Sequence, residues 1–554
     1  MGDLTNDVQL RRFAGYSIFF ATIVGGLLRA YSLGSQGLSH FDEGIYAISG
    51  LWPWTHQFEA SQGYFSPPLF PLLIGILELI YGGPSEQACL QVSWFFGTLT
   101  IPAVWLLLRE LHFQRGSIVA AWVIAVDPFH ATFSRTGLTD SLFCCLLVLS
   151  LFASIRALAR GGKWQICLAC LLIGFTWNTK YHGFYPLILS APFALNLGWR
   201  HGLRRLAIIG VGSFVLYLPW IIWFHVEHGY GNLIKHQAGY FQGLAALPSN
   251  LRVWCLLHGT FDWRWVLGIL VAAYAVLPGA TGLARSAVLF LIGFGLENCF
   301  HGRPELSFPL FFIIAVIAAL TNSRTKLSAV QHLWILIWLT FLPALYTPYA
   351  RLWLPADVLV LAFAGAGAWQ YLPELANRRS DNLLSWWPNR LFGRVPVSIL
   401  VAGAGVVLAW NVLPQQRGAL GQQRDWLVGK AGYREIAKQL KLTSQDGRIP
   451  VAAYCRPPLI FYSALNGYSI RRLAQARPDQ LPIAENELLV VDGMIVDSKE
   501  IEQSLKAWTP YLEVVNRWKL EPSIVTELDD TATGRLKDVD PRRYDVTVYR
   551  RKLK

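Results

Sequence analysis

Long apolar segments recur along most of this chain, and they restrict its fold more than any other feature. A helix needs about 20 apolar residues to cross a bilayer, because its backbone polar groups are then satisfied internally. About thirteen such segments are predicted in the sequence. They lie near residues 13–33, 87–108, 116–133, 138–158, 163–179, 182–199, 206–225, 263–283, 285–300, 305–321, 328–346, 352–372 and 395–413. The predicted fold class is therefore an α-helical polytopic membrane protein.

Composition agrees with a membrane protein and argues against other classes. Hydrophobic residues make up 53% of the chain and charged residues 15%, a balance that is unusual for a large soluble protein. A net charge of +13 would suit nucleic acid, but basic residues are also expected in cytoplasmic loops, so no nucleic-acid partner is predicted. Eight cysteines are scattered, and the CxxC pair Cys167 and Cys170 lies inside a predicted span. Neither a disulfide framework nor a thiol metal site is expected.

Basic loops set the predicted orientation, with the N-terminus in the cytoplasm. Alternate loops carry the Lys and Arg runs at Arg109–Arg115, Arg156–Lys163, Arg200–Arg205, Arg285, Arg324–Lys326 and Arg378–Arg394. The first span is too long for a cleavable signal, and no small-residue cleavage site follows it. The opposite face receives the loop with Asp42 and Glu43, the turns 135–140, 180–182 and 349–351, and the long loop His225–Asp262. The few ionisable residues on that outer face are candidates for function.

Two domains are predicted, with a boundary near Pro414 where the composition becomes polar. Residues 1–413 form the transmembrane domain, in which residues 34–86 are an outer loop and the apolar helix 69–81 lies along the interface. Residues 414–554 are predicted as an extracytoplasmic α/β domain. Its strands are expected at 450–455, 487–492, 511–518 and 544–551, and its helices at 433–442 and 499–508.

The first outer loop is the strongest candidate for chemistry. It reads SHFDEGIYAISG from Ser39, and it continues through a run of aromatic, Pro and Gly residues that includes Tyr64. A loop of roughly 50 residues is long for a connection between helices, and its aromatics argue against disorder. Asp42 and Glu43 would stand at a membrane face, where buried carboxylates need a partner. The alternative is a solvated turn or a helix cap, since acids favour the first turn of a helix.

Further ionisable residues fall at the outer ends of later spans. Asp140 begins a predicted helix, where capping is the alternative, and Arg135 either pairs with it or faces an anionic substrate. Lys180 and His182 lie in a turn between two apolar runs, and Arg351 follows Tyr349 in another. For Lys180 and Arg351 the alternative is snorkelling to the interface. Cations and carboxylates on one membrane face suit a reaction between an anionic lipid donor and an acceptor.

In this order, the motifs resemble those of the GT-C glycosyltransferases that use polyprenyl-phosphate sugars. That family includes the protein O-mannosyltransferases and the aminoarabinose transferases that modify lipid A. The resemblance rests on HFDEGIYA, FSPPLFPLLIGI, SRTGLTDSLFCCLLVLSLF, NTKYHGFYPLIL and YARLWLPADVLVLAF, and it covers about the first 410 residues. It implies a fold of about thirteen helices with a groove for the polyprenyl chain.

The resemblance also implies roles for individual residues. Asp42 would be the general base or the carboxylate that positions the acceptor, Glu43 its neighbour in the motif, and Asp140 the second acid. Lys180 and Arg351 would contact the donor phosphate, with inversion at the anomeric carbon. One departure is that Ser66 precedes Pro67 where the aminoarabinose transferases carry Glu-Lys. A phosphate-binding Lys is therefore missing there, which weakens the case for lipid A as acceptor. The expected substrate-binding set is Arg135, Lys180, His182, Arg351, Tyr349 and Tyr64.

The expected partners are a polyprenyl-phosphate sugar donor, a lipid, glycan or protein acceptor, and the bilayer of a bacterial inner or plasma membrane. No motif requires a metal, although the carboxylates and His182 are groups that can bind a divalent cation. A transporter or flippase is the competing interpretation, because intramembrane charges also mark transport pathways. A lipid-linked-sugar ligase or polymerase is a further rival, but it would use a long outer loop late in the chain.

Overall fold

The computed structural model describes residues 2–31, 33, 37–55, 66–114, 116–258, 307–321, 325–367, 432–473, 476–494, 499–520 and 545–552. The chain forms two compact units, and each is described by itself. The first unit comprises Met1–Tyr31, Trp94–Ser134 and Thr139–Ala419. The second unit comprises Ser32–Ser93, Arg135–Leu138 and Leu420–Lys554, so it combines the first outer loop with the C-terminal part of the chain.

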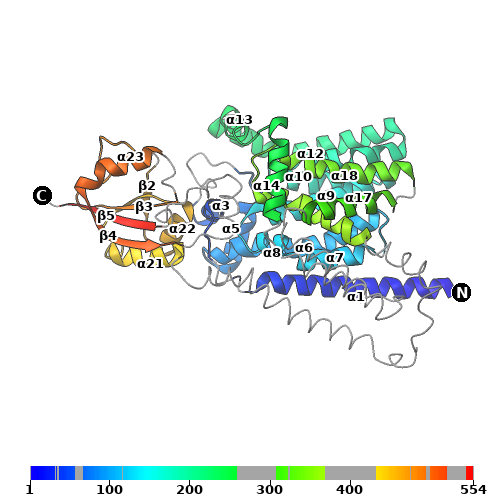
Figure 1. Ribbon diagram of the computed structural model, residues 1–554, viewed down its shortest axis with the longest axis horizontal. Helices are drawn as coiled ribbons and strands as arrows, with labels where there is room; N and C mark the ends of the chain where they lie inside the picture. Colours follow the sequence, from blue (N-terminus) through cyan, green and yellow to red (C-terminus); the bar gives the residue numbers. More distant parts are fainter. Residues whose placement is uncertain are drawn as a thin grey trace, which may run out of the picture. The chain divides into compact units, whose positions relative to one another are not determined.

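Apolar helices make up the first unit (Figure 1). Within the described residues, five helices are long and apolar enough to cross a bilayer, and the protein is an integral membrane protein. They are α6 Glu86–Glu110, α9 Thr139–Arg160, α12 Trp199–His228, α18 Lys326–Ala344 and the helix Ala350–Gly367. Shorter or partly polar helices are α1 Gly2–Ala30, α7 Gly116–Val126, α8 Pro128–Phe133, α10 Lys163–Trp177, α11 Tyr185–Ser190, α13 Tyr230–Ala238, α14 Leu247–His258 and α17 Ser307–Thr321. Helix α10 packs between α9 and α12.

The predicted span 116–133 is broken into two helices at Asp127. Pro128 is the first residue of α8, and the residue before a proline is displaced from the helical region, so α7 ends at Val126. Asp127 caps α8 by accepting the backbone N–H groups of Phe129 and His130, both at 3.1 Å. The buried Arg29 donates to the carbonyls of Ile124 and Ala125 that the break leaves without helical partners.

Other predicted spans differ from the structure in extent. Residues 182–199 form only the short α11 followed by a 3-10 helix, Ala191–Leu197, because Pro186 and Pro192 interrupt a regular helix. Spans 263–283, 285–300 and 395–413 lie outside the described residues. The mainly helical prediction is confirmed, whereas the number of thirteen spans is not.

In the second unit, the first outer loop is helical where it is described. Helix α3 covers Phe41–Gly50, the short α4 covers Trp52–Thr55, and the apolar α5 covers Leu69–Tyr81. Gly82 ends α5 in the left-handed region, with φ of 74°. Isoleucine and leucine side chains on one side of α5 remain exposed, which suits a helix lying along an interface.

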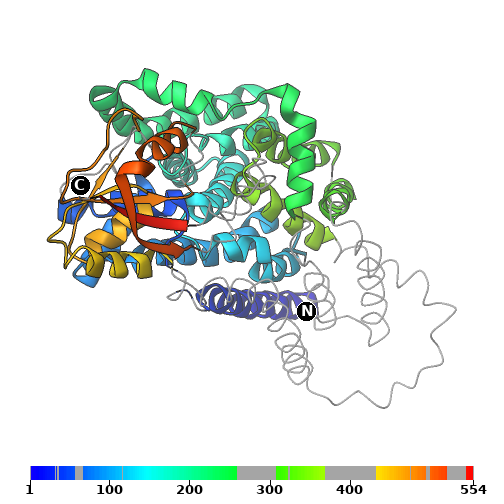
Figure 2. The ribbon, with the colours of Figure 1, turned by 60° about the vertical axis from the view of Figure 1, so that its left-hand side comes forward.

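The C-terminal residues of the second unit fold as an α/β sheet with the order β2-β1-β3-β5-β4 (Figures 1 and 2). The strands are β1 Val451–Tyr454, β2 Ile470–Arg472, β3 Leu488–Asp492, β4 Leu512–Lys519 and β5 Asp545–Arg551. Strands β1, β2 and β3 are parallel, and β5 runs antiparallel to β3 and β4. All four predicted strands and both predicted helices are present, now as α21 Tyr433–Thr443 and α23 Lys499–Trp508. Helix α22 Pro457–Leu465 and β2 were not predicted.

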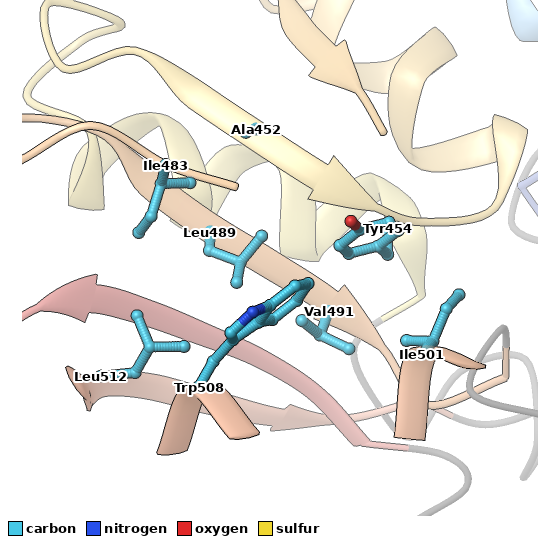
Figure 3. Packing of buried hydrophobic residues seen from close by; sticks show 8 residues of the cluster. All are labelled: Ala452, Tyr454, Ile483, Leu489, Val491, Ile501, Trp508 and Leu512. Carbon is cyan, nitrogen blue, oxygen red and sulfur yellow. The ribbon is translucent and has the colours of Figure 1, made fainter. Parts of the chain in front are cut away.

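Alternate residues of the central strands face two different layers. Ala452 and Tyr454 of β1 and Leu489 and Val491 of β3 point toward Trp508 of α23 (Figure 3). The opposite face carries α21, whose Tyr433 hydroxyl donates to Asp492 of β3 at 2.6 Å. The sheet is thus covered on both faces, as expected for buried parallel strands.

A polar clamp joins the two sequence segments of the second unit. Glu86, at the start of α6, accepts hydrogen bonds from the Arg434 guanidinium and from the Tyr462 hydroxyl at 2.5 Å. Tyr462 in turn accepts the backbone N–H of Leu38 at 2.6 Å. Burial beside the Glu86 carboxylate raises the pKa of Tyr462 well above its ordinary value, so the hydroxyl stays protonated and donates.

Replacing Glu86 with Gln is expected to destabilise the second unit, because the amide loses the charge that Arg434 and Tyr462 recognise. The expected loss is about 1–2 kcal/mol, measured as thermal unfolding of the detergent-solubilised protein. Glu502→Gln is the matched control, since Glu502 pairs with Lys506 on the exposed face of α23 and should change stability by less than about 0.5 kcal/mol. Equal losses in the two variants would contradict the clamp.

Candidate functional site

The acidic motif of the first loop lies at the N-terminus of α3. His40 is the N-cap residue, and its Nδ1 accepts the backbone N–H of Asp42 at 3.1 Å. Glu43 completes a capping box, because its Oε2 accepts the N–H groups of Ser39 and His40, both at 2.8 Å. The helix-cap interpretation that the sequence left open therefore describes Glu43.

Glu43 also binds a distant part of the second unit. Its Oε1 accepts the backbone N–H of Gly137 at 2.7 Å, across 94 residues of sequence. A side chain at Gly137 would come within 2.5 Å of the Cys89 sulfur, so the turn approaches only as glycine. Since Glu43 accepts three backbone N–H groups, it acts as a positioning residue for the turn Arg135–Leu138.

Asp42 lies in the same helix cap, where its backbone N–H donates to His40. Its side chain is only 4% exposed, and it lies in the first turn of α3, where a carboxylate is favoured. Its neighbour Phe41 lies under the Arg472 guanidinium at 5.8 Å. Two residues later, Gly44 approaches Pro458 so closely that an added Cβ would meet its nitrogen at 2.2 Å. Helix α3 is thus packed directly against the start of α22.

In the first unit, Asp140 and Lys180 form a buried ion pair. Lys180 Nζ lies 2.5 Å from Asp140 Oδ1, and the two side chains are 15% and 1% exposed respectively. Asp140 stands in the first turn of α9, and Lys180 follows the C-terminal end of α10. Among the described residues, Asp140 Oδ2 has no hydrogen-bond partner. This carboxylate oxygen could therefore accept one further donor.

Aromatic rings surround the ion pair. Lys180 Nζ lies 5.5 Å from the ring centre of Phe143, and the His182 ring packs edge-on against the same Phe at 4.7 Å. His182 also contacts Tyr185 at 5.0 Å. Burial, and then the Lys180 charge, lower the pKa of His182 to about 3. At neutral pH its imidazole is therefore uncharged, and Lys180 is the cation of this turn.

The contacts continue from Tyr185 to the late turn that carries Arg351. The Tyr185 hydroxyl donates to Tyr346, whose ring packs against Phe241 at 5.5 Å. Arg351 lies 5.2 Å from the ring centre of Tyr349. Backbone hydrogen bonds join the segment Tyr240–Gly243 to the segment Leu345–Thr347. The Asn250 amide adds to this contact by donating to the carbonyls of Ala344 and Tyr346. A continuous run of contacts thus joins Lys180, His182, Tyr349 and Arg351 within the first unit.

The remaining predicted residues are placed as follows. Arg135 is buried, at 2% exposed, in the turn that Glu43 binds. Tyr64 lies outside the described residues. Sequence reasoning missed Phe143, Tyr185 and Tyr346, although the first two stand in the quoted motifs, because periodicity alone assigns such aromatics to packing. Among the described residues, no group of three His, Cys, Asp or Glu side chains could hold a metal ion.

Comparisons with known proteins identify the architecture. The family model for dolichyl-phosphate-mannose-protein mannosyltransferase matches residues 66–223, which include Asp140, Lys180 and His182. The solved structure of ArnT from Cupriavidus metallidurans bound to undecaprenyl phosphate superposes with a TM-score of 0.56 at 13% identity, over 96% of this chain and 97% of that one. The chain has the GT-C fold. The motif resemblance is thereby confirmed at the level of the fold, and the family model matches it over residues 66–223.

A second solved structure agrees with the GT-C fold. The Archaeoglobus fulgidus oligosaccharyltransferase in complex with Zn and sulfate is similar with a TM-score of 0.51 at 14% identity. That similarity covers 90% of this chain and 71% of the oligosaccharyltransferase.

Two curated relatives match parts of the GT-C chain. Dolichyl-phosphate-mannose--protein mannosyltransferase 4 of Saccharomyces cerevisiae is 29% identical over 157 residues, 23% of this chain and 20% of that protein. Thiol:disulfide interchange protein DsbD 2 of Pseudomonas aeruginosa is 29% identical over 285 residues, 50% of this chain and 42% of that protein. The chain thus spans less than half the length of either relative. The CxxC of this chain, Cys167 and Cys170, lies within α10, and Cys167 is exposed.

Replacing one member of the Asp140–Lys180 pair is expected to destabilise the first unit more than replacing both members together. Asp140→Asn or Lys180→Met alone leaves a buried charge without its partner, which costs about 3–5 kcal/mol. The double variant removes both charges and should be more stable than the sum of the single losses implies. Thermal unfolding of the four proteins in one detergent measures this coupling, and strictly additive losses would show that the pair does not interact.

Proposed function

We propose that this protein is a membrane glycosyltransferase that moves a sugar from a polyprenyl-phosphate-linked donor to an acceptor on the outer face of the membrane. The observation that carries the proposal is the Asp140–Lys180 pair, which lies in the family-matched segment and connects through aromatic contacts to Arg351. Fixed cations in a dry site are what a sugar phosphate needs in order to leave as an anion.

Lys180 and Arg351 are the proposed contacts for the donor phosphate. Lys180 spends one donor on Asp140 and has two others for phosphate oxygens, while the guanidinium of Arg351 can bind two oxygens at once. Asp140 orients Lys180, and its second oxygen can accept a hydroxyl from the sugar or the acceptor. His182, Tyr349, Arg135 and Tyr64 complete the proposed substrate-binding set. Because Ser66 replaces the lysine of the aminoarabinose transferases, lipid A is not proposed as acceptor.

Asp42 is the proposed general base. The acceptor oxygen attacks the anomeric carbon, Asp42 takes the proton from that oxygen, and the bond from the anomeric carbon to the phosphate oxygen breaks. The polyprenyl phosphate leaves with the bonding electron pair. Glu43 is proposed to position Asp42 rather than to react, since all its observed contacts are backbone N–H groups.

The chemistry of the structural neighbours supports the substrate classes. ArnT was crystallised with undecaprenyl phosphate, and the archaeal oligosaccharyltransferase with a tethered acceptor peptide that contains the NVT sequon. A lipid-linked donor and a lipid, glycan or protein acceptor are proposed for this chain by analogy. We propose further that the N-terminus is cytoplasmic, that residues 1–413 form the membrane domain of a bacterial inner or plasma membrane protein, and that residues 414–554 are extracytoplasmic. The transporter alternative is not favoured, because the family match and the fold both belong to transferases.

Asp42→Asn is expected to lower kcat by at least about a hundredfold, because an amide cannot take a proton from the acceptor. Transfer from labelled polyprenyl-phosphate sugars is measured with purified protein. Asp479→Asn, an exposed position in the second unit, is the matched control and should retain full activity. Wild-type activity in Asp42→Asn would exclude the proposed base, whereas absence of transfer in the wild type would return the transporter interpretation.

The product is expected to have the anomeric configuration opposite to that of the donor, because a single direct displacement inverts the carbon. Proton NMR of the first product formed, recorded before any anomerisation, measures the coupling constant at the anomeric position. A product with unchanged configuration would require a covalent glycosyl intermediate and would overturn direct displacement.

A further inference from the structure

Two arginines stand at one edge of the C-terminal sheet. Arg456 follows β1 after a single residue, and Arg472 is the last residue of β2. Because β1 and β2 are parallel, with Ala453 paired to Arg472, both side chains belong to the carboxyl end of the strands. Helix α22 begins there at Pro457, so the first turn of this helix lies at the same edge.

The connections of β1 and β2 leave this edge on opposite faces of the sheet. Helix α22 follows β1 and packs with α21 on one face, whereas Leu481 and Ile483, after β2, pack with Trp508 on the other. The strand order β2-β1-β3 requires this reversal. In open α/β sheets, ligands bind in the crevice outside the carboxyl ends of strands where the connections diverge.

Neither guanidinium is neutralised by an ion pair with a described residue. Arg456 is only 7% exposed, and the carboxylate near it is Asp492, whose oxygens already accept Tyr433, Met494 and the Arg456 backbone N–H. Burial raises the pKa of Asp492, and the Arg456 charge opposes that rise, so Asp492 is a nearby carboxylate that is not bonded to the guanidinium. A buried cation without a bonded anion is costly, so the site favours an incoming oxyanion.

The neighbouring residue supplies a natural contrast. Arg471 points to the opposite face of β2 and forms a bidentate pair with Glu487, with contacts of 2.7 and 2.8 Å. Arg472 instead lies over Phe41, the residue before Asp42. The unpaired arginine of this strand is therefore the one directed toward α3.

We propose that the carboxyl edge of β1 and β2, through Arg456 and Arg472, binds an oxyanion carried by the acceptor, a phosphate or a carboxylate, and thereby holds the acceptor beside Asp42. This inference rests on the proposed transferase function. It assigns the C-terminal residues a role in choosing the acceptor, whereas Lys180 and Arg351 serve the donor. A group with two or more oxygens suits two guanidiniums, each of which can donate to more than one oxygen.

Steady-state transfer with two acceptors tests the proposal: a synthetic glycolipid that carries a phosphate monoester, and the same glycolipid after phosphatase treatment. The full-length wild type should prefer the phosphorylated acceptor by about tenfold in kcat/KM, the value expected when one charge-assisted contact is lost. Arg472→Gln should raise the KM for that acceptor about tenfold and abolish the preference, with the donor KM unchanged. Arg472→Lys should restore part of it, and Arg471→Gln should behave as wild type.

Several results would overturn the acceptor site. These are equal use of both acceptors by the wild type, equal effects of Arg471→Gln and Arg472→Gln, or a rise confined to the donor KM. Calorimetric titration of the same proteins with inorganic phosphate at low salt separates this inference from the proposed function. If no protein transfers sugar, phosphate binding that Arg472→Gln weakens tenfold retains the anion site, and binding that it leaves unchanged rejects it. Arg456→Gln, checked by thermal unfolding, is the second variant.

Discussion

The carboxylate of Glu43 organises the second unit, because three backbone N–H groups from two distant segments converge on it. Two of these groups belong to the start of α3 and the third to Gly137. A carboxylate in this position satisfies helix-end donors that would otherwise be buried without partners. The same interaction fixes the direction in which α3 begins, and therefore where Asp42 stands. Of the two adjacent acids, Glu43 holds the backbone, and Asp42 is the one proposed as the general base.

In the first unit, by contrast, charged side chains are buried among aromatic rings. Lys180 is paired on one side with Asp140 and lies over Phe143 on another. Each contact reduces the cost of keeping the ammonium out of water, and none occupies all of its donors. The neutral imidazole of His182 adds no competing charge. A largely buried cation of this kind suits the proposed electrostatic stabilisation of a leaving phosphate.

Much of this arrangement could be predicted from local sequence. The strands of the C-terminal domain follow from short runs rich in Val and Leu, such as LLVVD of β3, and the turn at Lys180 follows from the end of an apolar run. The Asp-Pro dipeptide at Asp127 signals the break, but the apolar run that continues past it has the length of a single span. Helix α22 was missed because its sequence, PPLIFYSAL, begins with two prolines and lacks a polar face. The role of Glu43 depends on a residue 94 positions away, which no local pattern can reveal.

The second unit is built from segments that lie far apart in the sequence. Residues 32–93 and 420–554 are separated by most of the membrane helices, yet Glu86, Arg434 and Tyr462 bind them into one body. The hydroxyl of Tyr462 extends that clamp to Leu38, four residues before Asp42. These contacts connect the C-terminal residues to the loop that bears the proposed base. In the proposed mechanism, Arg472 and Asp42, which bind and deprotonate the acceptor, both belong to the second unit, whereas the proposed phosphate contacts Lys180 and Arg351 belong to the first.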